Sequence, residues 1–283
     1  MKILFKNFRK KTGDIRYETS NDALRTFAAV GYPKVGNTWL RITLGKYLQE
    51  IYNLQDLPLM DSAEFPVLAA AGCKSIGEFT HYPLEWTTQK DSDLTLENVV
   101  KPFCNQRIVL LIRHPLDVLV SQYMQERYMV KDTSFSGSLT DFIEDPVFGL
   151  NKLLNFYRFW TQAEGLVSSV HFWRYEDARS DPAQSLEKLL RFLGEDIDAS
   201  AIARAVEFAS FDNLKAMEQS GQQDIVYKSS GLFVFGSAPK GDPNSMHVRK
   251  GVVGGYKDEL SPEDVGRFEA QIRSEMPLIY GYT

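Results

Sequence analysis

The sequence has few of the residues that build metal sites and disulfide frameworks. Its 283 residues include only two cysteines, Cys73 and Cys104, and only four histidines. Two thiols cannot form a disulfide framework or a four-thiolate metal site. The patterns H-E-x-x-H and C-x-x-C are both absent from the chain. We therefore expect neither a structural nor a catalytic metal ion.

The sequence also lacks an excess of basic residues and any long apolar run. Its 32 Lys and Arg residues are outnumbered by 37 Asp and Glu residues, and the formal net charge is −5. This balance argues against nucleic acid as a partner, because affinity for a phosphate backbone needs a broad surplus of cations. The longest apolar runs, such as residues 108–112, are far shorter than a membrane-spanning helix. Any anion that binds here must therefore be held by a local cluster of cations.

The first residues carry no recognisable export signal. Residues 1–11 mix basic and apolar side chains, without the continuous apolar core and small-residue cleavage site of a signal peptide. We interpret residues 1–25 as a poorly defined leader and residues 26–283 as one domain. We expect a cytoplasmic protein without integral membrane association.

Two apolar stretches that each precede a helical pattern indicate parallel β-strands. Residues 26–30 run into a turn that contains Gly and Pro, and from Thr38 onward apolar residues recur at helical spacing. Residues 107–113 are almost continuously apolar, as interior parallel strands are. Pro115 suits the first turn of the helix that follows.

The second half of the chain continues this alternation. Residues 169–176 are predicted as a third strand, followed by a helix that starts at Asp181 and ends near Gly194. Another helix fits residues 198–209, and residues 229–248 have the composition of a long loop. The whole pattern predicts a single-domain α/β fold, with a central parallel sheet flanked by helices and a P-loop-like strand–loop–helix.

The segment VGYPKVGNTWLR, residues 30–41, has the glycine spacing of a nucleotide-binding P-loop without its lysine. Gly31, Gly36 and Thr38 match the glycine and hydroxyl positions of G-x-x-x-x-G-K-[ST]. The lysine position holds Asn37, and the lysine of the loop is Lys34, three residues earlier. A loop that leads into a helix N-terminus binds anions through backbone N–H groups and the helix dipole. The alternative is an ordinary strand-to-helix turn.

Two further segments carry clustered donors suited to phosphate. Arg113 follows a buried strand, and Ser121 lies on the helix after it. A guanidinium offers a planar fork of donors to phosphate oxygens, and a hydroxyl adds another. Arg249, Lys250 and Gly251 form a second basic segment after the long loop. Each segment alone is also compatible with a solvated surface position.

Taken together, these segments resemble the sulfotransferase family that uses 3′-phosphoadenosine 5′-phosphosulfate (PAPS), in its cytosolic type and bacterial relatives. The family loop Y-P-K-[SA]-G-[TN]-T-W is matched by residues 32–39, and R-x-P-x-D-x-x-x-S by residues 113–121. The family's R-K-G is matched by residues 249–251, with weaker matches at 175–177 and 210–215. The five segments occur in family order and span about residues 27 to 257, nearly the whole chain.

The resemblance implies how the donor nucleotide is held. The loop would bind the 5′-phosphosulfate, the second and third segments the 3′-phosphate, and aromatic residues with a serine the adenine. The implied nucleotide-binding residues are Lys34, Gly36, Asn37, Thr38, Trp39, Arg113, Ser121, Tyr175, Ser210, Phe211, Arg249, Lys250 and Gly251.

The resemblance also implies the catalytic residues. His81 in THYP matches the family's K-T-H-x-P, whose histidine is the general base, and the ordinary pKa of histidine suits that task. Of the other histidines, His114 belongs to the phosphate turn, His171 to a strand, and His247 is the main rival. Lys34 would stabilise the leaving phosphate. Its positive charge would take the place of the charge that a lysine and a magnesium ion supply in kinases.

The sequence departs from the family pattern at two positions and in one missing motif. Phe79 replaces the lysine two residues before the base, and Val35 replaces a frequent serine. The dimerisation pattern K-x-x-x-T-V-x-x-x-E is not found after Lys257, so the oligomeric state stays open.

The resemblance implies a small-molecule acceptor, with PAPS as the sulfuryl donor and no metal. We expect the acceptor between residues 61–83 and 123–148, under a lid at 232–235. Aromatic side chains give these stretches a partly apolar character, which favours a small hydroxyl compound, although several of the rings are equally explained as core. These side chains are Phe65, Phe79, Tyr82, Trp86, Phe233 and Phe235.

Two alternative functions remain. A P-loop kinase or NTPase would have a lysine at position 37 and a strand ending in a magnesium-binding Asp, a role for which only Asp177 is available. A non-catalytic nucleotide-binding module on the same fold would not need both Lys34 and His81.

Overall fold

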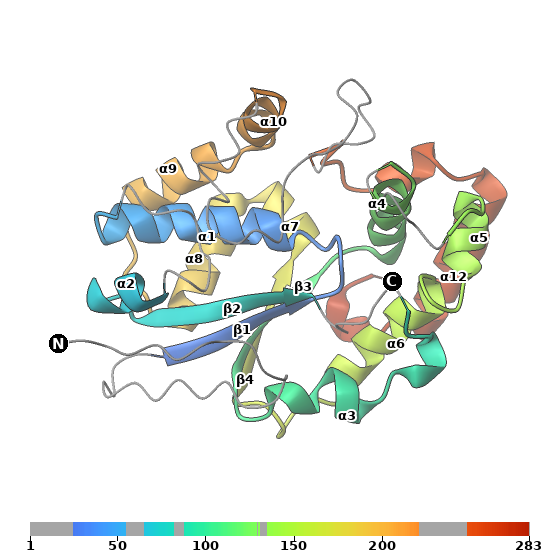
Figure 1. Ribbon diagram of the computed structural model, residues 1–283, viewed down its shortest axis with the longest axis horizontal. Helices are drawn as coiled ribbons and strands as arrows, with labels where there is room; N and C mark the ends of the chain where they lie inside the picture. The colour runs from blue at the N-terminus through green and yellow to red at the C-terminus, as the bar shows by residue number, and fades with distance from the viewer. Residues whose placement is uncertain are drawn as a thin grey trace.

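The described part of the chain contains one parallel four-stranded sheet, which confirms the predicted single-domain α/β fold (Figure 1). The computed structural model describes residues 25–54, 65–81, 88–128, 130, 135–220 and 248–282. The strands follow the order β2-β1-β3-β4, and all three neighbouring pairs are parallel. Their bounds are β1 Arg25–Gly31, β2 Ser75–His81, β3 Arg107–Ile112 and β4 Ser169–Arg174.

Helices cover both faces of the sheet, with α1, α8 and α9 on one face and α3 and α6 on the other (Figure 1). The α-helices are α1 Asn37–Ile51, α2 Phe65–Ala70, α3 Leu96–Val99, α4 Pro115–Tyr128, α5 Leu139–Glu144, α6 Leu150–Trp160, α7 Tyr175–Ser180, α8 Pro182–Leu193, α9 Ala199–Phe208, α10 Phe211–Ser220 and α12 Pro262–Glu275. Short 3-10 turns are η2 Asp91–Asp93, η3 Lys101–Phe103, η5 Gly255–Asp258 and η6 Leu278–Tyr280.

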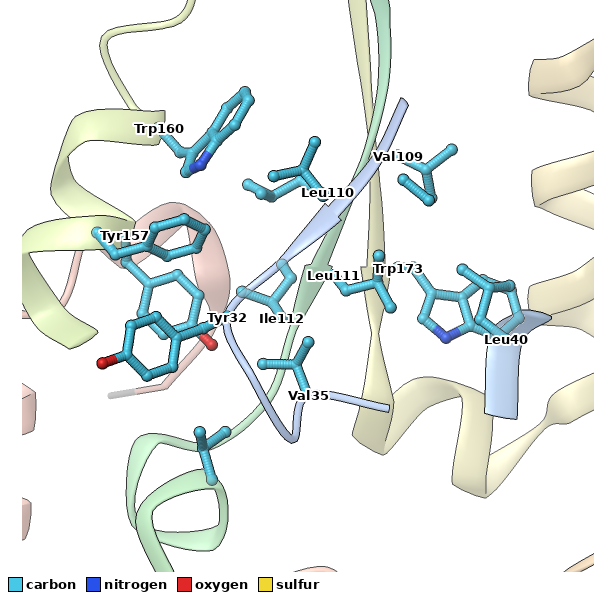
Figure 2. Packing of buried hydrophobic residues seen from close by; sticks show 14 of the residues in the cluster. Tyr32, Val35, Leu40, Val109, Leu110, Leu111, Ile112, Tyr157, Trp160 and Trp173 are labelled. Atoms are coloured by element: carbon cyan, nitrogen blue, oxygen red, sulfur yellow. The ribbon is translucent and has the colours of Figure 1, made fainter. Parts of the chain in front are cut away.

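The apolar run of β3 is explained by burial on both faces. Residues 108–112 are all at most 1% exposed. Figure 2 shows Val109 and Leu111 on the side of Trp173, and Leu110 on the side of Trp160. Both faces of the strand are thus covered by apolar side chains, which is the reason why the strand shows no polar face.

Helix α8 begins and ends where the sequence predicts. The Asp181 carboxylate accepts a hydrogen bond of 2.9 Å from the backbone N–H of Gln184 and so caps the first turn. Gly194 ends the helix in the left-handed conformation, with a φ of 80°.

The ends of two predicted strands and one whole strand differ from expectation. β3 ends at Ile112, so Arg113 lies in the turn after it, and β4 ends at Arg174, so Tyr175 is the first residue of α7. β2, which ends at His81, is not predicted from the sequence at all. It is an edge strand, and its mixture of polar residues and glycine lacks the apolar run that reveals an interior strand.

Several expectations concern residues outside the described ranges. They are the leader up to residue 24, the side chains of Phe65, Tyr82, Trp86, Phe233 and Phe235, the rival histidine His247, and most of the loop 229–248. Within the described ranges, no helix combines the length and apolar character that a membrane span needs.

Candidate functional site

The four strands deliver predicted site residues to the same edge of the sheet. In a parallel sheet all carboxyl ends meet at one edge, where loops bind ligands. The loop with Lys34 follows β1, His81 ends β2, Arg113 follows β3, and Tyr175 follows β4. The register places Gly31 opposite His81, so the loop and the histidine start side by side.

These residues surround a cavity of about 250 Å³. It receives further lining from α4, α10 and the segment 248–255. Of the predicted site residues, all but Ser210 line this cavity. The members of this set are Lys34, Gly36, Asn37, Thr38, Trp39, His81, Arg113, Ser121, Tyr175, Phe211, Arg249, Lys250 and Gly251.

The loop between β1 and α1 depends on backbone conformations that few residues adopt. Gly36 precedes α1 with a φ of 104°, and a Cβ there would lie 2.9 Å from the ring of Tyr175. A larger residue would therefore meet both backbone strain and a steric clash. Lys34 has a φ of 71°, an uncommon conformation for a residue with a side chain. Such strain concentrates at functional sites.

Asn37 occupies the lysine position of a P-loop and makes a structural contact. Its side-chain Nδ2 donates a hydrogen bond of 3.3 Å to the carbonyl oxygen of Thr80, next to His81. The side chain thereby links the first turn of α1 to the end of β2. Position 37 contributes no positive charge, and the cation of this loop is Lys34.

Burial lowers the pKa of both catalytic candidates. Desolvation lowers the pKa of Lys34 to about 8, with help from the charges of Arg113 and Arg249, while Glu218 acts in the opposite direction. Desolvation also lowers the pKa of His81 to about 4, and the positive charge of Lys34 adds to this effect. His81 is therefore neutral at physiological pH, with a pKa well below the near-neutral value expected from the sequence.

Arg113 is fixed by contacts on several sides. Its Nη1 donates a hydrogen bond of 3.1 Å to the carbonyl oxygen of Lys34, and its guanidinium lies 4.3 Å from the centre of the Tyr175 ring. The hydroxyl of Tyr157 accepts from the backbone N–H of Arg113 and donates to its carbonyl oxygen. The turn after β3 is thus held against the loop after β1.

Aromatic residues converge on one end of the cavity. Trp39 donates a hydrogen bond of 2.9 Å from Nε1 to the carbonyl oxygen of Ala209, and its ring meets that of Tyr175 edge-on. Gly251 adopts a φ of 62°, and a Cβ at this position would run into the ring of Phe211. The glycine of R-K-G is therefore required for close contact with an aromatic ring of the site.

Ser210 differs from the other predicted residues. It immediately precedes α10, and its Oγ accepts a hydrogen bond of 3.4 Å from the backbone N–H of Asn213. Instead of the main cavity, it lines a smaller adjoining pocket of about 130 Å³ together with Trp39 and Phe211.

The chain that directly follows the R-K-G segment is bound to α4 by Asp117. The carboxylate accepts hydrogen bonds from the backbone N–H groups of Gly254 at 2.8 Å and Tyr256 at 3.2 Å. Asp117 is only 4% exposed and lies one turn of α4 before Ser121. The aspartate of R-x-P-x-D-x-x-x-S therefore has a structural task that the sequence comparison does not reveal.

Two further carboxylates hold the R-K-G segment and the residue before it. Glu218 of α10 accepts a hydrogen bond of 2.9 Å from the backbone N–H of Val248. One oxygen of Glu259 contacts both Arg249, at 2.8 Å, and Lys250, at 2.7 Å. Burial raises the pKa of Glu259, but the hydrogen bonds from both cations outweigh it and leave the pKa below its usual value.

Sequence reasoning misses several polar residues that line the cavity: Asp117, Gln125, Arg179 and Glu218. Asp117 belongs to a recognised pattern, and Arg179 lies one helical turn after Tyr175, so spacing could have indicated both. Glu218 lies beyond the matched segment 210–215, and we find no sequence signal for it.

Of the six expected acceptor rings, only that of Phe79 lies within the described residues, and it packs against the core. Phe79 packs edge-on against Phe27, with ring centres 6.2 Å apart, and does not line the main cavity. Tyr123, Phe142 and Phe148 are buried and pack against each other or a shared neighbour. For Phe79, the alternative interpretation as a core residue holds.

The family assignment comes from comparison with known proteins. The model of the sulfotransferase domain matches residues 25–279. Cytosolic sulfotransferase 17 of Arabidopsis thaliana is 26% identical over 271 residues, which cover 86% of this chain and 72% of the plant protein. Amine sulfotransferase of Oryctolagus cuniculus is 25% identical over 173 residues, 60% of this chain and 54% of its own length.

Solved structures share the fold at lower identity. Mouse sulfotransferase SULT7A1, complexed with PAP, aligns with a TM-score of 0.56 and 22% identity over 89% of this chain and 83% of the mouse chain. Retinol dehydratase in complex with androsterone and PAP aligns with a TM-score of 0.57 and 17% identity, over 89% and 81% of the two chains. Because the family model covers nearly the whole chain, the resemblance seen in the sequence is confirmed, and this protein belongs to the sulfotransferase family.

Proposed function

We propose that this sulfotransferase transfers the sulfuryl group of PAPS to a hydroxyl of a small, partly apolar acceptor. The observation that carries the proposal is the position of Lys34. The loop lysine lies in the same cavity as His81 and Arg113, where the ends of three parallel strands meet. A cation and a neutral base in one cavity suit transfer between a phosphate leaving group and a hydroxyl.

The 3′-phosphate of the nucleotide is assigned to Arg113, Ser121 and Arg249. These residues come from the turn after β3, from α4 and from the R-K-G segment, yet they line the same cavity. A phosphate accepts charge-assisted hydrogen bonds from guanidinium groups, which are stronger than neutral ones. The contact of Arg113 with Lys34 joins this subsite to the loop that would hold the 5′-phosphosulfate.

The adenine is assigned to the end of the cavity formed by Trp39, Tyr175 and Phe211. Aromatic faces stack on a purine irrespective of hydrogen bonding, and such stacking contributes about 1–3 kcal/mol per base. Ser210 lies in the adjoining pocket and is the least supported of the assigned residues.

Lys34 is assigned to the leaving group. As the bond between sulfur and the bridging oxygen breaks, negative charge develops on that oxygen, and the new bond forms between sulfur and the acceptor oxygen. A well-placed donor aimed at developing charge contributes about 3 kcal/mol. The pKa of about 8 leaves the Lys34 ammonium mostly protonated at pH 7, and a bound polyanion would raise it further.

His81 is assigned as the general base that takes the hydroxyl proton. A base must be neutral before it can accept a proton, and the lowered pKa of His81 keeps it so. Its affinity for a proton would rise when the negative charges of the nucleotide enter the cavity. The lysine that the family carries two residues earlier is replaced by Phe79, which leaves less positive charge here for a long anionic acceptor.

The test is a panel of hydroxyl, amine and carbohydrate acceptors incubated with radiolabelled PAPS. We expect sulfation of a small hydroxyl compound, unaffected by EDTA, and a loss in kcat of about a hundredfold or more in His81→Ala with nucleotide affinity retained. No product from any acceptor would favour the non-catalytic module. Thermal stabilisation by ATP and magnesium, but not by adenosine 3′,5′-bisphosphate (PAP), would favour a kinase. The plant relative is named cytosolic, which supports a cytoplasmic location.

A further inference from the structure

Arg179 is a cavity residue that none of the family segments includes. It lies on α7, four positions after Tyr175 and therefore on the same face of the helix. Its side chain lines both the main cavity and the adjoining pocket. Tyr175 and Arg179 thus reach the site from successive turns of one helix.

The guanidinium of Arg179 lies over two of the three rings that are assigned to the adenine, those of Trp39 and Phe211. Its central carbon is 5.8 Å from the centre of the Trp39 ring and 5.9 Å from that of Phe211. A flat base stacked on a ring would lie about 3.5–4 Å from it, the usual contact distance between carbon atoms. The guanidinium is therefore farther from both rings than a stacked base would be, and close enough for its N–H groups to reach polar atoms of such a base.

Arg179 differs from the other arginines of the cavity in its partners. Arg113 donates to a backbone carbonyl, and Arg249 is paired with Glu259. Arg179 has only its two ring contacts, with no hydrogen bond or ion pair to any residue in the described ranges. Nearby Asp177 contacts Arg174 instead. The donors of Arg179 are thus available for a ligand.

We propose that Arg179 binds the edge of the purine base of the nucleotide. This inference rests on the proposed function, which places the nucleotide in this cavity. Adenine exposes ring nitrogens that accept hydrogen bonds, and a guanidinium presents planar donors in the plane of such a base. Arg179 would then select for a purine, whereas Arg113 and Arg249 select for the phosphate on the 3′-carbon.

Binding of three nucleotides separates a base contact from general attraction between charges. The affinities of AMP, PAP and uridine 3′,5′-bisphosphate are measured by calorimetry for the native protein and for Arg179→Ala. We expect about a tenfold loss for AMP and for PAP alike, about 1.4 kcal/mol each, because both carry the same base. Uridine 3′,5′-bisphosphate should lose less than threefold.

A matched control is available on the neighbouring helix. Arg191 of α8 is exposed and paired with Glu187, outside the cavity, so Arg191→Ala should leave all three affinities unchanged. Arg179→Lys keeps the charge without the planar fork and should lose nearly as much affinity as Arg179→Ala.

Two results would overturn the inference about Arg179 while leaving the proposed function intact. One is a loss that is larger for PAP than for AMP and equal for the two bisphosphates, which would indicate attraction by charge alone. The other is unchanged affinity for PAP. If the native protein itself fails to bind PAP, the proposed function fails instead.

Discussion

At the scale of single residues, the charge of Lys34 influences the protonation of His81. Part of the reason why the pKa of His81 is near 4 is the positive charge of the lysine, after the larger effect of burial. A base that is easily protonated would be lost to catalysis in mildly acidic solution. The lysine that we assign to the leaving group would therefore also keep the proposed base available.

We expect Lys34→Gln to raise the pKa of His81. NMR titration of the histidine side chains would measure this shift, with Lys46→Gln as the control, because Lys46 pairs with Glu50 on α1. An unchanged value in Lys34→Gln would contradict the electrostatic link.

The same pKa predicts how stability depends on pH. Between about pH 6.5 and pH 4 the unfolded chain binds a proton at His81 that the folded protein does not, so stability is lost as the pH falls through this range. We expect the thermal midpoint of His81→Asn to fall less over this range than that of the native protein. Equal declines would show that His81 is not held neutral by the fold.

Glu259 is the clearest case of a side chain that competes with a ligand. Its carboxylate pairs with Arg249 and Lys250, two of the cations assigned to the nucleotide. A phosphate must share or displace this partner, because both carry negative charge into the same space. We expect Glu259→Gln to bind PAP several-fold more tightly and AMP about as before. Weaker binding of PAP would mean that Glu259 chiefly positions Arg249.

At the scale of elements, Asp117 connects α4 with the chain after the R-K-G segment across 137 positions. Replacing it with Ala leaves the buried N–H group of Tyr256 without its acceptor, which costs about 1–3 kcal/mol, and removes the acceptor of the partly buried N–H group of Gly254. We expect Asp117→Ala to increase hydrogen exchange in residues 248–256 and to weaken PAP binding. Asp145 makes a comparable pair of backbone contacts away from the site, so Asp145→Ala is a control that should leave this segment unchanged.

The elements that sequence reasoning finds are those whose cause is local. β1 with its loop and α1, β3 with α4, and α8 with its cap and terminal glycine all follow from apolar runs and turn residues close together in the chain. The edge strand β2 lacks such a run. The strand β4 ends one residue before Tyr175, which the sequence predicts as part of that strand. Asp117 and Glu218 bond residues that are far away in the chain, and Glu218 and Glu259 lie outside the segments that match the family. No local sequence pattern therefore predicts these contacts.

At the scale of the whole molecule, the candidate site draws on residues from Lys34 to Gly251. No short segment contains more than a part of it, so the nucleotide should bind only the folded chain. Ligand at a hundred times its dissociation constant then stabilises the protein by about 2.7 kcal/mol.

The strand order of the sheet has a kinetic consequence for this stabilisation. β1 pairs with β2 through Arg25 and Ser75, and with β3 through Phe27 and Arg107, so its partners are far along the chain. Such pairings form slowly, because long loops must close before any contact stabilises them. We expect the loop around Lys34 to reach its final shape only after these strands have paired. The nucleotide should therefore bind after strand pairing, which is the slow step of folding. PAP should therefore slow unfolding in denaturant and leave the rate of refolding nearly unchanged. Stopped-flow fluorescence would measure both rates. Faster refolding in the presence of PAP would mean that the loop forms early.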